Sequence, residues 1–192
     1  MMENIATEAR NGTSRIKAGG TVDVLARDRS GHHVFKQMKW GLVPPDFGGF
    51  PDEWHGSTTH ARIETVHELP SYRAAWERKW RVIFLMDHYL QKTTGMQDLF
   101  GKSAKEVRVK IGRSDGQLMA VAGIYSAIKR PSGLFLSCAM LTRPASAGLE
   151  EINERFPLML ELEEVRPWLD GADNLDLLTP PPADRLSTVL AG

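Results

Sequence analysis

Short runs of alternating hydrophobic and polar residues recur along the chain, which is the pattern of β-strands that bury one face. Residues 21–28 (TVDVLARD) alternate in this way and follow the turn-forming pair Gly19-Gly20. A second run, 32–44, follows a Ser30-Gly31 turn. Two strand-like runs separated by so short a turn predict a β-hairpin.

Further runs extend the β character of the sequence. Residues 80–92 are apolar at their centre, and residues 133–142 are apolar after a Pro-Ser-Gly turn, so both predict buried strands. In 107–128, Asp115-Gly116 lies between two β-rich segments. An Asp-Gly pair in this position predicts a second hairpin.

Helical patterns are fewer and shorter. We expect helices over 69–80, which opens with Pro and Ser, over 146–156, and over 161–171, where Pro167 should shorten or kink the helix. The Pro-rich tail, about 178–192, is expected to run extended over the surface. Many strands with a few short helices predict one mixed α+β domain over 1–192, built on a curved, mostly antiparallel sheet.

Composition narrows the function classes only slightly. The 192 residues are 42% hydrophobic and 25% charged, and 24 basic side chains balance 24 acidic ones. This neutrality removes the simplest argument for nucleic-acid binding, although it leaves room for a local basic face. No long apolar run predicts a membrane span or signal peptide, and the single cysteine, Cys138, is consistent with a reducing compartment. We therefore expect a cytoplasmic protein that has no membrane partner.

The segment 60–65 (HARIET) concentrates a histidine, an arginine and a glutamate. His60 and Glu64 would lie close together in a helix, but a zinc site needs three or four ligands, and neither paired cysteines nor an H-E-x-x-H motif occurs. Glycine-rich phosphate-binding loops are also missing, so we expect neither a metal nor a cofactor. Cys138 lies in an apolar run and is interpreted as a packing residue.

Aromatic and basic residues indicate a possible binding surface. Trp40 and Trp54 flank a loop rich in Pro and Gly, where an aromatic ring can stack on a base while cations hold phosphate. Trp40 could instead be a core anchor at a strand end. Arg62, Arg81 and Arg155 lie beside apolar residues, where a guanidinium needs either an acid or a bound anion.

Several separate segments together resemble one family, the SOS-response-associated peptidase (SRAP) family. The matching segments occur in the family's order over about 15–170, and each is weak alone. They are WGLVP (40–44), HARIET (60–65), RVIFLMDHYLQK (81–92), VAGIY (121–125), 142–145 and INERFPL (152–158). The resemblance implies a SRAP-like fold, a curved mostly antiparallel sheet or barrel. It also implies binding of single-stranded DNA and a role in the response to DNA damage.

The resemblance further implies a covalent reaction. In such proteins an N-terminal cysteine, exposed by removal of the initiator methionine, forms a stable thiazolidine cross-link with the aldehyde of an abasic site. An asparagine, a glutamate and a histidine assist it. At the four matching positions this chain has Met2, His60, Gln91 and Asn153. Glutamine cannot ionise and is no general acid or base, so we expect the family's autoproteolysis and cross-linking to be lost.

Three functions follow from this comparison. The first is reversible binding of single-stranded or abasic DNA through Trp40, Trp54, Arg62 and Arg155, with Glu64 as a partner of an arginine and Arg81 in a supporting position. The second is an enzyme with altered, peptidase- or lyase-like chemistry centred on His60, with Glu64 or Asp87 as its acid. The third is a protein-interaction role for a pseudoenzyme that has lost DNA binding. We favour the first, and the sequence leaves the oligomeric state open.

Overall fold

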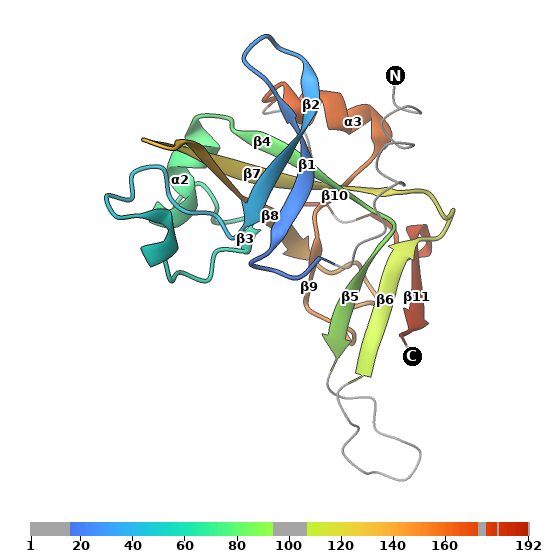
Figure 1. The fold of residues 1–192 in the computed structure, drawn as a ribbon. Helices are drawn as coiled ribbons and strands as arrows, with labels where there is room; N and C mark the ends of the chain where they lie inside the picture. The colour runs from blue at the N-terminus through green and yellow to red at the C-terminus, as the bar shows by residue number, and fades with distance from the viewer. Residues whose placement is uncertain (1–15, 94–106, 173–175, 180, 192) are drawn as a thin grey trace.

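The structure is a computed structural model that describes residues 16–93, 107–172, 176–179 and 181–191. Most of its regular elements are strands (Figure 1). The strands are β1 (Thr21–Arg27), β2 (His33–Trp40), β3 (His60–Arg62), β4 (Arg81–Met86), β5 (His88–Thr93), β6 (Val107–Arg113), β7 (Met119–Arg130), β8 (Gly133–Pro144), β9 (Arg155–Pro157), β10 (Met159–Leu160) and β11 (Leu186–Leu190). The helices are α2 (Pro70–Glu77) and α3 (Leu162–Leu169), with 3-10 turns at Pro51–Glu53 and Ala183–Arg185.

The larger sheet closes on itself. Its strand order is β10-β7-β4-β1-β2-β8-β3, and an additional pairing of β7 with β8 joins β7, β4, β1, β2 and β8 into a ring (Figure 1). Strands β2 and β3 run parallel to β8, and the other pairings of this sheet are antiparallel. The predicted fold class, a mixed α+β domain on a curved and mostly antiparallel sheet, is confirmed.

The first hairpin forms as the alternation predicts. Strand β1 pairs with β2 from Thr21 opposite Lys39 to Arg27 opposite His33. The turn between them is stabilised by the Asp28 carboxylate, which accepts hydrogen bonds from the backbone N–H groups of residues 30 and 32 at 2.9 Å each. Gly31 has a φ of +86°, a conformation that glycine adopts without steric cost.

The second predicted hairpin is wrong. Asp115 and Gly116 do form a turn, and Gly116 has the expected positive φ of +71°. The strands on either side separate, however, because β6 joins a second sheet of order β11-β6-β5 while β7 joins the ring. The physical reason is that β6 buries Val109 and Ile111 against Phe156, whereas β7 buries its side chains in the main core.

The predicted strand over 80–92 is also divided. It breaks at Asp87 into β4, which lies in the ring, and β5, which lies in the second sheet. The tail, expected to be extended, does run extended, and its strand β11 completes the second sheet by pairing with β6. This sheet projects from one end of the ring (Figure 1).

Two of the three predicted helices form. α2 and α3 lie within the expected ranges, and α3 contains Pro167 and ends before Gly171, whose φ is +84°. Among the described residues no helix is long and apolar enough to cross a membrane.

The helix expected over 146–156 is wrong, because the chain makes turns there and then enters β9. Gly148 has a φ of +86°, and its N–H donates to the Glu150 carboxylate at 2.7 Å. This local hydrogen bond competes with the helical pattern.

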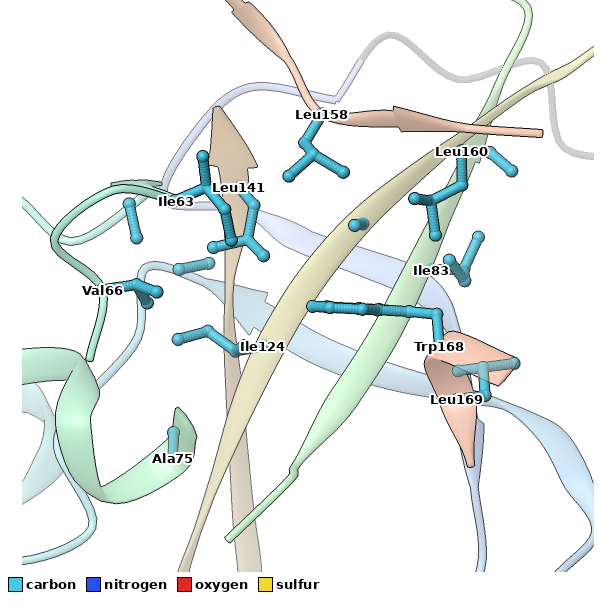
Figure 2. Packing of buried hydrophobic residues seen from close by; sticks show 14 of the residues in the cluster. Ile63, Val66, Ala75, Ile83, Ile124, Leu141, Leu158, Leu160, Trp168 and Leu169 are labelled. Carbon is cyan, nitrogen blue, oxygen red and sulfur yellow. The ribbon is translucent and has the colours of Figure 1, made fainter. Parts of the chain in front are cut away.

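The core has components on both faces of the ring strands. One cluster includes Ile83 and packs against α2 and α3, with Trp168 fully buried at its centre (Figure 2). The Trp168 indole N–H donates to the carbonyl of Val82 at 3.0 Å, so the ring is both packed and hydrogen-bonded. A second cluster takes alternate positions, including Val82 and Phe84, and therefore lies on the opposite face of the strands.

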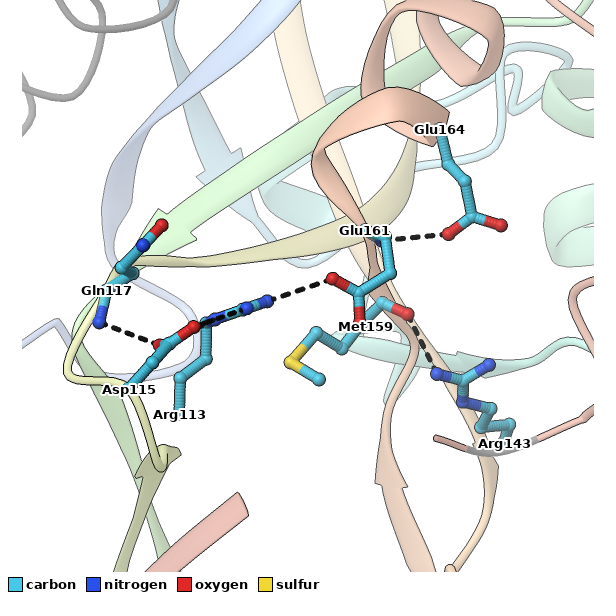
Figure 3. A network of polar contacts seen from close by, with 7 residues as sticks. All are labelled: Arg113, Asp115, Gln117, Arg143, Met159, Glu161 and Glu164. Carbon is cyan, nitrogen blue, oxygen red and sulfur yellow. Dashed lines mark hydrogen bonds and ion pairs between the residues drawn. The ribbon is translucent and has the colours of Figure 1, made fainter. Parts of the chain in front are cut away.

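Polar contacts connect the second sheet to the ring. Arg113, at the end of β6, forms ion pairs with Asp115 at 2.7 Å and with Glu161, the residue before α3, at 3.3 Å (Figure 3). Glu161 in turn receives a capping interaction, because its backbone N–H donates to Glu164 at 2.8 Å. Nearby, buried Arg143 donates to the carbonyl of Met159 at 2.8 Å. These contacts fix the β6–β7 turn against the start of α3.

Candidate functional site

Strand β3 places His60 and Arg62 on one side of the larger sheet. The strand lies at the edge, parallel to β8, with His60 opposite Met140 and Arg62 opposite Thr142. Ala61, between them, is buried on the other face. The segment continues into turns rather than a helix, so the i,i+4 helical relation between His60 and Glu64 does not occur.

His60 lies against protein although the residue as a whole is exposed. Its imidazole packs edge-on against Trp40, with ring centroids 5.5 Å apart, and Nδ1 lies 3.0 Å from the Thr59 hydroxyl. The surrounding protein desolvates the ring, and this burial lowers the pKa of His60 below its usual value of 6.5. The imidazole is therefore neutral near pH 7 and can both donate and accept a hydrogen bond.

Glu64 and Arg155 form a closed pair beside this strand. The Arg155 guanidinium donates to both carboxylate oxygens of Glu64, at 2.6 and 2.8 Å, and to the carbonyl and hydroxyl of Thr142, at 2.8 and 3.2 Å. The hydrogen bond from Arg155 is the main cause that lowers the pKa of Glu64 below its usual value of 4.5. The predicted role of Glu64, holding an arginine, agrees with this geometry.

The two candidate arginines therefore differ in their charge environment. Arg155 is neutralised by Glu64 and is mostly buried, with 22% of its side chain exposed. Arg62 is exposed, and within the described part of the chain it forms no ion pair. Arg62 is thus the available cation of this site, whereas Arg155 connects β9 to the turn after β3.

Gln91 and Asn153 lie on facing segments next to the pair. Gln91 shares a face of β5 with Tyr89, which packs on Phe156, and with Thr93, whose hydroxyl donates to the carbonyl of Glu151 at 3.4 Å. That face is therefore directed at the segment that contains Asn153. The Asn153 side-chain oxygen accepts a hydrogen bond from the Arg155 backbone N–H at 2.9 Å.

The two candidate tryptophans are both partly buried and hydrogen-bonded. The Trp40 indole N–H donates to the carbonyl of Thr59 at 2.9 Å, and its ring lies 5.9 Å from Phe84 between centroids, so Trp40 anchors the base of the site beneath His60. Trp54 packs edge-on against Phe47 at 5.3 Å and donates to the Thr58 hydroxyl at 3.1 Å. Both rings stabilise the loop before β3.

Some predicted residues lie away from this group. Arg81 is buried between Trp76 and Trp168, 3.7 and 4.5 Å from the ring centroids, on the opposite face of the sheet. Asp87 is exposed and pairs with His88 at 3.3 Å. Met2 lies outside the described residues.

Sequence reasoning missed two residues that shape the site. Thr142 holds the Arg155 guanidinium, and Tyr72 of α2 donates from its hydroxyl to the carbonyl of His60 at 2.9 Å. Thr142 belongs to the matching segment 142–145, but neither role could be predicted, because each acts through a contact between segments distant in sequence. In the described ranges, no three His, Cys, Asp or Glu side chains form a group that could hold a metal ion.

Comparison with known proteins gives a consistent result. The family model described as SOS response associated peptidase (SRAP) matches residues 4–190. The Bacillus subtilis "Abasic site processing protein YoqW" is 31% identical over 148 residues, which is 76% of this chain and 61% of that protein. The rat "Abasic site processing protein HMCES" is 28% identical over 163 residues, 73% of this chain and 46% of that protein. The chain thus spans less than two thirds of either relative.

Solved structures show the same fold. A protein from Bordetella bronchiseptica superposes with a TM-score of 0.77 at 24% identity, covering 92% of this chain and 86% of that one. A protein from Bacteroides thetaiotaomicron gives a TM-score of 0.76 at 21% identity, covering 91% and 76%. At these identities the likeness shows the shared fold.

Proposed function

Because the chain belongs to the SOS response associated peptidase (SRAP) family, we propose that it binds single-stranded DNA at abasic sites reversibly, through the surface formed by His60, Arg62 and Trp40. Relatives are named as abasic site processing proteins, which supports a role connected with DNA damage. The observation that carries the proposal is the exposed Arg62 guanidinium, which makes no ion pair among the described residues. A phosphate would provide a direct ion-pair partner for Arg62, whose attraction to Glu64 acts only at longer range.

The surroundings of Arg62 suit an abasic nucleotide. His60 offers a neutral ring beside the cation, and the indole of Trp40 lies beneath it. Arg155 has a positioning role, because its bidentate pair with Glu64 uses the groups that a phosphate would need. In this proposal Arg62 contacts DNA and Arg155 only supports the site, whereas the sequence alone predicts that both arginines contact DNA.

The residue set also favours binding without a covalent bond. Gln91 carries an amide where a general acid or base would be needed, and Asn153 carries another. The chain's one thiol, Cys138, is fully buried, and burial raises its pKa to about 12. No accessible thiolate is therefore available to attack an aldehyde.

A fluorescence anisotropy titration with an abasic single-stranded oligonucleotide tests the binding. We expect affinity to fall with salt, and Arg62→Ala to weaken binding about tenfold and reduce the salt slope by about 1, because one phosphate contact is lost. Arg166→Ala, which removes an exposed cation on α3, the helix packed on the opposite face of the larger sheet, serves as the matched control and should bind like the wild type. Unchanged binding in Arg62→Ala would contradict the proposal.

A restoration experiment tests the loss of covalent chemistry. Wild-type protein incubated with abasic DNA should give no covalent band on a denaturing gel. The combined variant Met2→Cys, His60→Asn, Gln91→Glu and Asn153→His returns the family's four side chains and should give one. A covalent band from the wild type would show that this chain retains the reaction.

One observation favours a second candidate, a lyase centred on His60. Its imidazole is neutral near pH 7 and lies 3.0 Å from the Thr59 hydroxyl, so it could act as a general base. The same gel distinguishes this function, because strand cleavage by the wild type that disappears in His60→Ala would support it.

A further inference from the structure

The second sheet has one face that packs on the protein and one that faces outward. Tyr89 of β5 contacts Phe156 on the packed side, so His88 and Leu90, which alternate with Tyr89, lie on the other side. The strand register places Leu90, Lys110 and Val189 in one row across this outer side. We call the surface the outer sheet face, and its residues line a shallow hollow. They are His88, Leu90, Arg108, Lys110, Val189 and Ala191.

Two cations on the outer sheet face form no ion pair with another described residue. Arg108 and Lys110 are exposed, and neither forms an ion pair within the described ranges. The outward positions of β5, β6 and β11 include no Asp or Glu. Asp87, at the start of β5, pairs with His88, and Glu106, two residues before Arg108 in the sequence, lies outside the described residues. In a protein with zero net charge, two unpaired cations in adjacent outward positions make a local basic patch.

The same face also exposes aliphatic side chains, on either side of Lys110. Val189 is 59% exposed and lies beside Lys110. Leu90 occupies the other side of Lys110 in the same row. The row Leu90–Lys110–Val189 thus places an aliphatic side chain on each side of a cation, which lets apolar contact combine with charge pairing to a protein partner.

We propose that the outer sheet face docks an acidic segment of a partner protein. Carboxylates of the segment pair with Arg108 and Lys110, and its aliphatic side chains cover Leu90 and Val189. The positive charges of Arg108 and Lys110 favour a segment that carries carboxylates. Leu90 and Val189 favour a peptide over nucleic acid, because they offer apolar contacts and the face has no Trp, Tyr or Phe on which a base could stack.

This surface is distinct from the proposed DNA site. Strand β5 separates the two, since Gln91 faces the segment around Asn153 whereas Leu90 faces outward. The docking proposal therefore does not depend on DNA binding. A partner could occupy the outer sheet face while Arg62 is bound or free.

The test is an anisotropy titration of the full chain with a short fluorescein-labelled peptide of repeated Asp-Asp-Leu units. We expect saturable binding that weakens with salt. The double variant Arg108→Glu, Lys110→Glu should weaken it about tenfold, since two favourable charge pairs become repulsive. Val189→Ser keeps the charges and should also weaken binding, because it removes the apolar contact. Lys36→Glu reverses an exposed charge elsewhere and should bind like the wild type.

Two further probes decide between occupants. A peptide of repeated Lys-Lys-Leu units should not bind. Labelled oligo-dT should bind the double variant as well as it binds the wild type, and a large loss there would assign the face to nucleic acid and overturn the proposal. Absence of peptide binding at low salt, or peptide binding that the double variant does not change, would also overturn it. Circular dichroism of each variant confirms that the strands remain folded.

Discussion

Individual side chains on β3 and β9 show how the same residue type acquires different roles. Arg62 and Arg155 are both arginines beside apolar residues, yet among the described residues only Arg155 forms a direct ion pair with Glu64, which Arg62 attracts only at longer range. The difference comes from the turn after β3, which brings Glu64 to Arg155 and leaves Arg62 on the strand face. A guanidinium engaged by two carboxylate oxygens and a carbonyl oxygen has few donors left for phosphate.

The Glu64–Arg155 pair predicts a pH-dependent contribution to stability. The pKa of Glu64 is lowered in the folded state, so the pair stabilises fully above about 4.5 and loses its contribution as pH falls through the lowered pKa. We expect Glu64→Gln to destabilise by about 1 kcal/mol near neutral pH, a modest value because the pair is partly exposed. Urea unfolding at several pH values measures this. A stability difference that stays constant down to strongly acidic pH would contradict it.

His60 predicts that DNA binding strengthens in mild acid. Desolvation lowers its pKa below 6.5, so the ring is neutral at pH 7 and gains a proton as pH falls through the lowered pKa. The added charge lies on His60, on the same face of β3 as Arg62, where phosphate is expected. The affinity for an abasic oligonucleotide should rise severalfold between about pH 7 and 5, and His60→Gln should remove this rise. An equal rise in His60→Gln would assign it to another group.

Among the elements, β7 determines how the ring closes. This strand pairs with β4 along one edge and with β8 along the other, so it completes the ring. Gly123 lies where the three strands meet, opposite Val82 and Met140. A Cβ atom at this position would lie 2.5 Å from the Phe84 ring and 2.7 Å from the carbonyl oxygen of Ala139. The close approach requires glycine here.

Gly123→Ala therefore tests the packing of the closure. We expect a loss of about 2 kcal/mol or more in unfolding free energy, because a backbone oxygen cannot move aside as a flexible side chain would. Gly48→Ala is the matched control, since a Cβ atom there meets nothing within 4 Å, and it should change stability by less than about 0.5 kcal/mol. Urea unfolding midpoints of both variants give the comparison. Equal midpoints would show that the strands around Gly123 shift to accommodate the added methyl group.

The whole molecule combines a ring with a smaller second sheet, and the site lies on the side of the larger sheet that faces the second core cluster. Cys138 lies in that cluster with no exposed surface, and its thiol donates to the carbonyl of Lys39 at 3.6 Å. Access to the thiol therefore requires the strands around it to open. This makes the only cysteine a reporter of global unfolding.

Thiol labelling should accordingly be slow in the native protein. With a pKa of about 12, only about one part in ten thousand of the buried thiol is ionised near pH 8, and the reagent also lacks access. A disulfide reagent such as 5,5′-dithiobis(2-nitrobenzoate) should react fully in denaturant and almost not at all without it. Rapid stoichiometric labelling of native protein would show that this side of the core is open.

Elements with strong local signals were predictable from the sequence. The β1–β2 hairpin follows from alternation and a glycine turn, and α2 and α3 follow from their composition and terminal Pro or Gly residues. The prediction of a helix over 146–156 was wrong, because a glycine in the left-handed region and a hydrogen bond to Glu150 redirect the backbone. The prediction of a hairpin over 107–128 was wrong, because periodicity does not distinguish strands that pair with each other from strands that join separate sheets.

The sequence by itself determined the fold class and the family, since these depend on residue type and order, and it predicts that Met2, His60, Gln91 and Asn153 stand at the family's reactive positions. Only the tertiary structure decided which arginine is available, that Trp40 supports His60, and that Arg108 and Lys110 share an outward face. Each of these depends on contacts between segments distant along the chain. A pairing such as that of Glu64 with Arg155 leaves no local pattern because it depends on how the sheet closes.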